Sequence, residues 1–180
     1  PGNGFGIYET RKGKKVAVLH LLGQVFHKEY LDSPFYAAEE ALSGVALGGN
    51  VDAILVDMHA EATSEKNAMG HFLDGRVSAV VGSHTHVPTA DARVFPEGTG
   101  YLTDAGMCGD YDSILGCQKE APMHRLMHST PSGRFECAEG EATLCGFAVE
   151  TDDRTGLAKA CWAVRLGPLL EESLPKGWEA

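Results

Sequence analysis

Three histidines stand at the ends of two apolar segments of the sequence. His59 comes just after the run at 51–57, VDAILVD, and His84 and His86 follow the run at 77–81, VSAVV. Near-continuous apolar runs of this kind are typical of strands that are buried on both faces. In open α/β sheets, ligand sites gather beyond the carboxyl ends of the strands. If the two runs form neighbouring parallel strands, the three imidazoles meet at one edge of the sheet.

The spacing of His84 and His86 predicts that both rings face one site. In extended backbone, residues two apart point to the same side, and Thr85 between them would face away. Neutral imidazoles held a few ångströms apart suit one first-row transition metal or two neighbouring ions. The alternative is that these are ordinary loop histidines, but two strand-end clusters favour the metal site. The histidines without this placement are expected to be surface or core residues: His20, His27, His71, His124 and His128.

Polar residues follow His59 in the segment HAEATSEK at 59–66. Glu61 and Glu65 are candidates for acceptors that orient a ligand histidine, and a surface position for Glu61 is an equal alternative. A hydroxyl of Thr63 or Ser64 is expected to cap the next helix. The glycine-rich stretch 98–109 contains Asp104 and forms either a site-lining loop or simple turns, and it matches no Walker motif.

The first half of the chain alternates strand and helix patterns. Strands are expected at 15–22, 51–57 and 77–81. Helices are expected at 35–47, after a Ser-Pro start at 33–34, and at 62–73. This order predicts the α/β class, built on βα units.

The second half has the character of short strands and turns. Residues 1–6 and 104–116 are expected to be loops. The expected strands are 91–95, 100–103, 134–137, 143–151 and 157–166, of which the last two form an antiparallel pair. One domain over 1–166 and a peripheral tail over 167–180 follow from this pattern.

Composition limits the classes of function that the chain can have. It has 180 residues, 43% of them hydrophobic, and a formal net charge of −10. A protein that binds nucleic acid through its phosphates usually carries a basic face, so stable general nucleic-acid binding is not expected. Five cysteines without a C-x-x-C pair indicate reduced thiols. With no signal peptide and no apolar run long enough for a membrane, the expected location is the cytoplasm.

Several segments carry a family resemblance. They are LGQVF at 22–26, DMHAEATSEK at 57–66, LDGRV at 73–77, GSHTHV at 82–87 and TDAGM at 103–107. The series resembles the YmdB-like branch of the calcineurin-type metallophosphoesterases through most of the chain. The resemblance implies the C-terminal part of an α-β-β-α sandwich, with a mixed sheet and additional antiparallel strands.

The resemblance also implies a function. His59, His84 and His86 match the metal-ligand histidines of the family, and Glu61 and Thr85 lie beside them. The implied cofactors are two transition metals, divalent or mixed-valence, with iron or manganese the usual occupants. The implied reaction is hydrolysis of a 2′,3′-cyclic nucleotide by a 2′-phosphodiesterase. The substrate would be a small phosphodiester or an RNA end, and a homo-oligomer is left open.

The sequence departs from the family pattern in one respect. It contains no G-N-H and no N-G-E-N segment, so the family's other metal ligands and its proton-donor histidine are expected ahead of Pro1. No catalytic acid is therefore assigned in this chain, and the chain alone is expected to have impaired or absent activity. Two metal ions also need a bridging carboxylate that three neutral imidazoles do not supply. The alternatives are a non-catalytic metal-binding or assembly module and a mononuclear three-histidine site.

Overall fold

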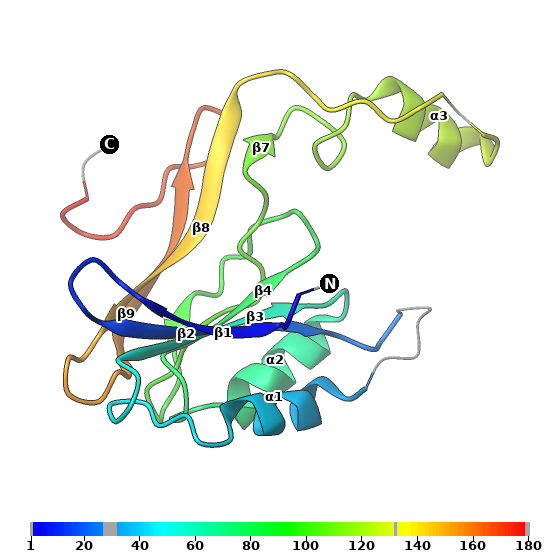
Figure 1. The fold of residues 1–180 in the computed structure, drawn as a ribbon. Coiled ribbons are helices and arrows are strands. Elements are labelled where there is room, and N and C mark those ends of the chain that lie inside the picture. The colour runs from blue at the N-terminus through cyan, green and yellow to red at the C-terminus, as the bar shows by residue number, and fades with distance from the viewer. Residues whose placement is uncertain (1, 27–31, 132, 179–180) are drawn as a thin grey trace.

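A six-stranded mixed sheet forms the centre of the molecule in the computed structural model, which describes residues 2–26, 32–131 and 133–178. Its strand order is β1-β2-β3-β4-β6-β5, in which the four inner strands are parallel and the two edge strands are antiparallel to their neighbours (Figure 1). The strands are β1 (Phe5–Glu9), β2 (Lys15–Leu22), β3 (Ala53–His59), β4 (Ala79–Ser83), β5 (Arg93–Val94) and β6 (Gly100–Leu102). The carboxyl ends of the parallel strands therefore meet at one edge.

Two helices, α1 (Pro34–Leu42) and α2 (Thr63–Phe72), lie together on one side of this sheet (Figure 1). Burial alternates along β3, where Ile54, Val56 and Met58 are almost fully buried. These side chains belong to one apolar core together with Met69 of α2 and residues of β2 and α1. Because side chains alternate between the two faces of a strand, Asp57 and His59 point to the face away from this core.

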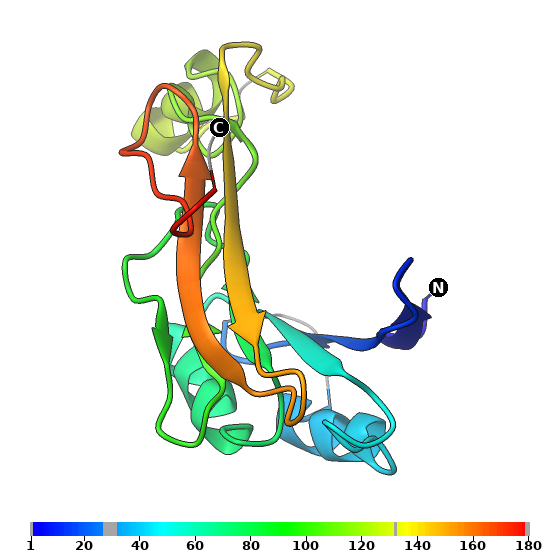
Figure 2. The same ribbon diagram turned by 90° about the vertical axis from the view of Figure 1, so that its left-hand side faces the viewer.

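A second sheet extends away from the first. It consists of β7 (Gly109–Asp110), β8 (Ala142–Thr151) and β9 (Ala158–Leu166), all antiparallel. The long β8–β9 hairpin packs through β9 against β5 and β6 and then rises well beyond the central sheet (Figure 2). Helix α3 (Glu120–His128) lies at the far end of this extension (Figure 1).

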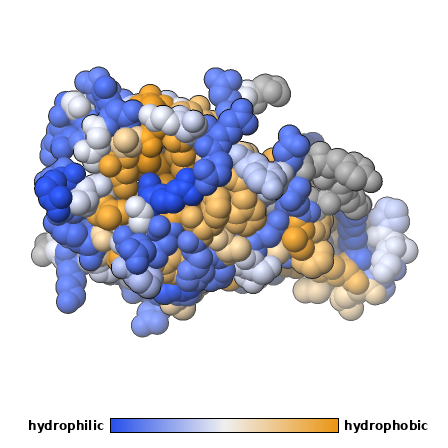
Figure 3. Space-filling model, turned by 90° about the horizontal axis from the view of Figure 1, so that it is seen from below, coloured by the Kyte–Doolittle hydropathy of each residue, from blue (hydrophilic) through white to orange (hydrophobic). Residues whose placement is uncertain are grey.

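The polarity of the exposed side chains differs between the central sheet region and the extension. Seen from below, the side that carries α1 and α2 shows polar side chains around a smaller apolar area (Figure 3). Several apolar residues of the extension are exposed, including Leu126 and Met127 of α3. None of the helices in the described part of the chain has the length and apolar character needed to cross a membrane.

The α/β class is confirmed, with a mixed sheet and a separate antiparallel sheet. The strand expected at 15–22 has these same bounds, whereas β3 and β4 begin and end two residues later than expected. His59 is therefore the last residue of its strand rather than a residue beyond it. The helix expected at 35–47 ends at Leu42, because the chain turns at Gly44, which has φ +81°.

Three further expectations were wrong. The segment expected to be a loop at 1–6 contains the start of β1, which is held by antiparallel pairing with β2. Residues 134–137 form no strand and contribute only one isolated bridge, between Cys117 and Cys137. The segment expected to be a loop at 104–116 contains β7, which pairs with β8. In addition, helix α3 was not among the expected elements. The tail turns back on β9, where the backbone of Ser173 pairs with that of Arg165 in both directions.

Candidate active site

The register of the parallel strands brings polar residues side by side at the carboxyl edge. His20 of β2 pairs with Asp57 of β3, and His59 at the end of β3 pairs with Ser83 at the end of β4. His20 and Asp57 lie within the strands that the sequence predicted, whereas His59 and Ser83 lie just beyond the predicted bounds, and the register is a property of the folded sheet. This placement sets up a continuous line of polar contacts.

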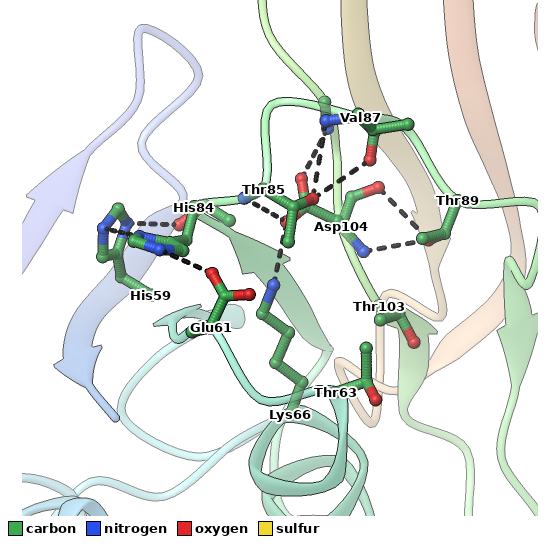
Figure 4. Close-up of polar contacts among 12 residues, drawn as sticks. His59, Glu61, Thr63, Lys66, His84, Thr85, Val87, Thr89, Thr103 and Asp104 are labelled. Carbon is green, nitrogen blue, oxygen red and sulfur yellow. Dashed lines mark hydrogen bonds and ion pairs between the residues drawn. The ribbon is translucent and has the colours of Figure 1, made fainter. Parts of the chain in front are cut away.

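The line of contacts runs from His20 to Glu61 across three strand ends. Nδ1 of His20 lies 2.7 Å from Asp57 Oδ2, and the Ser83 hydroxyl donates to Asp57 Oδ1 at 2.6 Å. Nδ1 of His59 lies 3.0 Å from the Ser83 oxygen, and its Nε2 lies 3.1 Å from Nδ1 of His84. Nε2 of His84 then lies 2.9 Å from Glu61 Oε2 (Figure 4).

The side chains in part of this line have one polar hydrogen fewer than the number of contacts that each need one. Four contacts join Asp57 to Glu61, whereas the Ser83 hydroxyl and two neutral imidazoles supply only three hydrogens. With both carboxylates ionised, one more positive charge, either a proton or a metal ion, completes the set. A cation at the two imidazoles would supply this charge.

The distance between the two rings also fits a shared ion. Two ring nitrogens bound at about 2.0 Å to one tetrahedral ion lie about 3.3 Å apart, and the observed separation of His59 Nε2 and His84 Nδ1 is 3.1 Å. Within the described part of the chain, no three His, Cys, Asp or Glu side chains form a group that could hold a metal ion. The donors present here thus fit part of a metal site rather than a whole one.

His86 does not adopt the expected arrangement. The extended backbone predicted for the H-x-H segment is wrong, because His84 has φ 112° and His86 has φ 65°. With this twist the two rings have different neighbours: His84 meets His59 and Glu61, whereas His86 Nδ1 lies 3.0 Å from the carbonyl oxygen of Leu115. The structure thus joins two of the three predicted ligand histidines and turns the third to a neighbouring position.

The polar residues after His59 divide into two groups. Glu61 contacts His84 and its side chain is 53% exposed, so it fits both alternatives, an orienting acceptor and a surface position. Glu65 does not orient a histidine, because its carboxylate accepts the backbone N–H groups of Gln24 and Val25. The helix expected to be capped by Thr63 or Ser64 has Ala62 at its N-cap and no capping side chain.

Beneath the histidine loop lies a buried ion pair. Lys66 Nζ of α2 and Asp104 Oδ2 are 2.8 Å apart, with side chains 0% and 1% exposed. Asp104 also accepts the backbone N–H of Thr85 at 3.0 Å and that of Gly106 at 2.9 Å (Figure 4). Burial alone would raise the pKa of Asp104, but the hydrogen bonds from Lys66, Gly106 and Thr85 outweigh it and hold the pKa below its ordinary value.

A hollow of about 1110 Å³ opens beside His86. Its walls come from the loop around Leu115 and from α3 with the segment that follows it, and they include Leu126 and Phe135. The Arg125 guanidinium lies 5.8 Å from the centre of the Phe135 ring. The hollow combines apolar surface with one cation next to a predicted ligand histidine.

Several residues of the site could not be singled out from the sequence. His20, expected to be an ordinary histidine, contacts Asp57, and only the strand register reveals this. Lys66 gave no signal, because nothing in a helical pattern marks a lysine as fully buried. Among the other histidines, His71 stacks on Phe95, His124 and His128 adjoin on α3, and His27 lies outside the described residues.

Comparisons with known proteins show what the whole chain is similar to. The chain is 48% identical over 155 residues to the 2′,3′-cyclic-nucleotide 2′-phosphodiesterase of Bacillus subtilis strain 168, which covers 86% of this chain and 57% of that protein. It is 36% identical over 167 residues to a putative phosphatase/phosphodiesterase of Mycoplasma pneumoniae, covering 92% of this chain and 57% of that one. The chain thus spans a little over half the length of these curated relatives.

Two solved structures have the same fold. A hypothetical protein from Thermus thermophilus superposes with a TM-score of 0.80 at 40% identity, over 93% of this chain and 63% of that chain. A novel phosphatase from Mycoplasma pneumoniae superposes with a TM-score of 0.79 at 35% identity, over 92% and 58%. The family described as YmdB-like protein matches residues 1–164. The chain therefore belongs to the YmdB-like protein family.

Proposed function

We propose that this chain carries the metal-binding histidines of a two-metal phosphodiesterase that hydrolyses 2′,3′-cyclic nucleotides. The contact between His59 and His84 is the observation that carries the proposal, because it places two imidazoles from separate strand ends at the spacing of shared ligands. The B. subtilis relative bears the name of this activity. Iron or manganese is the expected metal, since both accept imidazole and carboxylate ligands.

In this proposal the three histidines serve two ions. His59 and His84 hold one ion between them, and His86, turned to a neighbouring position, holds the second. When bound, two such ions would neutralise charge on the phosphoryl oxygens and lower the pKa of a water molecule. By this proposal, a bridging carboxylate and the proton donor lie in the part of the relatives' length that this chain does not span.

The side chains around the histidines keep the rings in place. Glu61 contacts the far nitrogen of His84, and Ser83 and Asp57 fix the orientation of His59 through Nδ1. Acceptors that bind the second nitrogen of a ligand histidine set its tautomer and raise its basicity. Ser83 and Asp57 do this for His59 in the proposed site.

The hollow beside His86 is the proposed place for the nucleoside. It adjoins the ring that holds the second ion, so a phosphate at the metals would put the attached base within its apolar walls. Arg125 offers a cation to a base or to an adjacent phosphate of an RNA end. Hydrolysis then adds water across the bond between phosphorus and O2′, which leaves a free 2′-hydroxyl and a 3′-phosphate.

The test is hydrolysis of 2′,3′-cyclic AMP by the full-length protein in the presence of Mn²⁺. The proposal predicts 3′-AMP as the product, a loss of at least about 100-fold in rate for His84→Ala, and a wild-type rate for His71→Ala. His71 is the matched control because it stacks on Phe95 and lies outside the line of polar contacts. A full-length protein that binds two Mn²⁺ ions but leaves the cyclic phosphate intact would refute the activity. One weakly bound ion without hydrolysis would favour the non-catalytic module.

A further inference from the structure

The segment that bears His84 and His86 is held in a strained conformation. Both histidines have positive φ angles, which non-glycine residues rarely adopt and which persist only where the surroundings impose them. The residue between them is Thr85, whose backbone N–H donates to Asp104 at 3.0 Å. The carboxylate that takes this hydrogen bond is therefore a main support of the strained turn.

Asp104 is itself fixed from below. Lys66 reaches it from α2 at 2.8 Å, and both side chains are almost completely buried. The lysine side chain passes close to Gly82 at the end of β4, where an added Cβ would lie 2.7 Å from Lys66 Cδ. The other carboxylate oxygen of Asp104 binds the N–H of Gly106. A buried charge with so many partners cannot turn away from Thr85 without losing them.

We propose that the Lys66–Asp104 ion pair is a positioning device that holds the histidine loop in its metal-binding conformation. The inference rests on the proposed function, because its purpose is to fix two ligand histidines. Asp104 acts on the histidine loop through the Thr85 peptide, and Lys66 acts through Asp104. If the pair has this positioning role, the hydrogen bond from Thr85 to Asp104 affects the metal affinity more than the charges of Lys66 and Asp104 do.

Three variants of the full-length protein separate these roles. Asp104→Ala removes the acceptor of the Thr85 N–H. The double variant Lys66→Met/Asp104→Asn removes both charges and keeps an oxygen for Thr85. Ser78→Ala is the matched control, because it removes a buried hydroxyl that binds Ile54 N and Gly156 O near the start of β4, at the opposite end of the strand from the histidines.

The first readout needs no metal. Hydrogen exchange of the Thr85 amide in the metal-free protein should accelerate at least about 10-fold in Asp104→Ala beyond the change in Ser78→Ala at the same temperature. In the double variant, the exchange rate of the Thr85 amide should stay within about 3-fold of the rate in the unmodified protein. Unchanged exchange in Asp104→Ala would show that the carboxylate does not hold the turn and would overturn the inference.

The second readout is Mn²⁺ affinity, corrected for the folded fraction. The Mn²⁺ affinity of Asp104→Ala should be about 10- to 100-fold lower than that of the unmodified protein, the range found when a residue that supports a metal ligand is removed. The double variant and Ser78→Ala should remain within about 3-fold. Equal affinity in Asp104→Ala and Ser78→Ala would mean that the pair only stabilises the fold, which contradicts the inference. Failure of the unmodified protein to bind Mn²⁺ would instead refute the proposed metal site, and the positioning role with it.

Discussion

Nδ1 of His84 lies 3.1 Å from Nε2 of His59, although the two residues are 25 positions apart in the sequence. Parallel pairing of β3 with β4 produces this contact, since it aligns His59 with Ser83, the residue just before His84. The rings meet nearly at right angles, with centres 4.9 Å apart. This sheet edge gathers three imidazoles, those of His20, His59 and His84, and the carboxylates of Asp57 and Glu61 in one line of contacts.

Removal of Glu61 should weaken the metal site without unfolding the protein. Glu61→Ala takes away the acceptor at Nε2 of His84, and loss of such a partner is expected to lower Mn²⁺ affinity about 10-fold. Calorimetric titration of the full-length protein measures the change. Glu40→Ala, the same substitution on the exposed face of α1, should leave the affinity as it is. Equal affinities in the two variants would show that Glu61 has no orienting role.

Gly82 should tolerate no side chain. A Cβ at this position would overlap the carbonyl oxygen of Thr103 and press on Lys66. Gly82→Ala is therefore expected to lower the free energy of unfolding by at least about 3 kcal/mol, at the upper end of overpacking costs. Gly146→Ala in β8 is the matched control, because its Cβ would meet nothing closer than 4.0 Å. Similar denaturant midpoints for the two variants would contradict the close approach of Gly82 in β4 to Thr103, the residue that follows β6.

The stability that Asp104 contributes should depend on pH in a defined window. Its pKa is lowered in the folded state, so its contribution is fully present above the unfolded pKa of about 3.9 and is lost as pH falls through the lower folded value. The difference in free energy of unfolding between the wild type and Asp104→Asn should be equal at pH 7 and pH 5. It should shrink only below about pH 4. A difference that already shrinks between pH 7 and pH 5 would argue against an ionised, hydrogen-bonded Asp104.

Arg125 should affect substrate binding more than turnover. If the hollow beside His86 receives the nucleoside, Arg125→Ala should raise KM for 2′,3′-cyclic AMP about 5-fold and leave kcat within about 2-fold. Glycerol 1,2-cyclic phosphate, which has no base, should show little change. Arg11→Ala in the β1–β2 turn serves as the control for loss of a positive charge. A proportional loss of kcat in Arg125→Ala for both substrates would place Arg125 in the chemistry rather than in recognition.

The sequence predicted the sheet edge better than the loops above it. Apolar runs showed where β3 and β4 lie, and strand ends in parallel sheets share an edge, so the convergence of His59 and His84 could be expected. The turn of His86 toward Leu115 could not. It depends on positive φ angles that are imposed by partners distant in sequence, among them Asp104, 19 residues from Thr85.

The sequence patterns missed β1 and helix α3. β1 is short and half exposed, and its conformation comes from pairing with β2 rather than from its own pattern. Helix α3 has apolar residues at helical spacing, Met123, Leu126 and Met127, but these are exposed and only Pro122 of the helix is buried in the described structure. For β1 a tertiary contact decides the conformation, and local sequence carries little information about such contacts.

Anomalous diffraction from crystals of the full-length protein with Mn²⁺ tests the central claim most directly. The account predicts one manganese peak shared by the rings of His59 and His84, and a second peak beside His86. The position of the first peak does not depend on the contact between His84 and Glu61. It does depend on the contact between His59 and His84. Manganese peaks elsewhere in the map would contradict the claim that His59 and His84 share an ion. So would a map in which the two rings remain in contact and no peak lies between them.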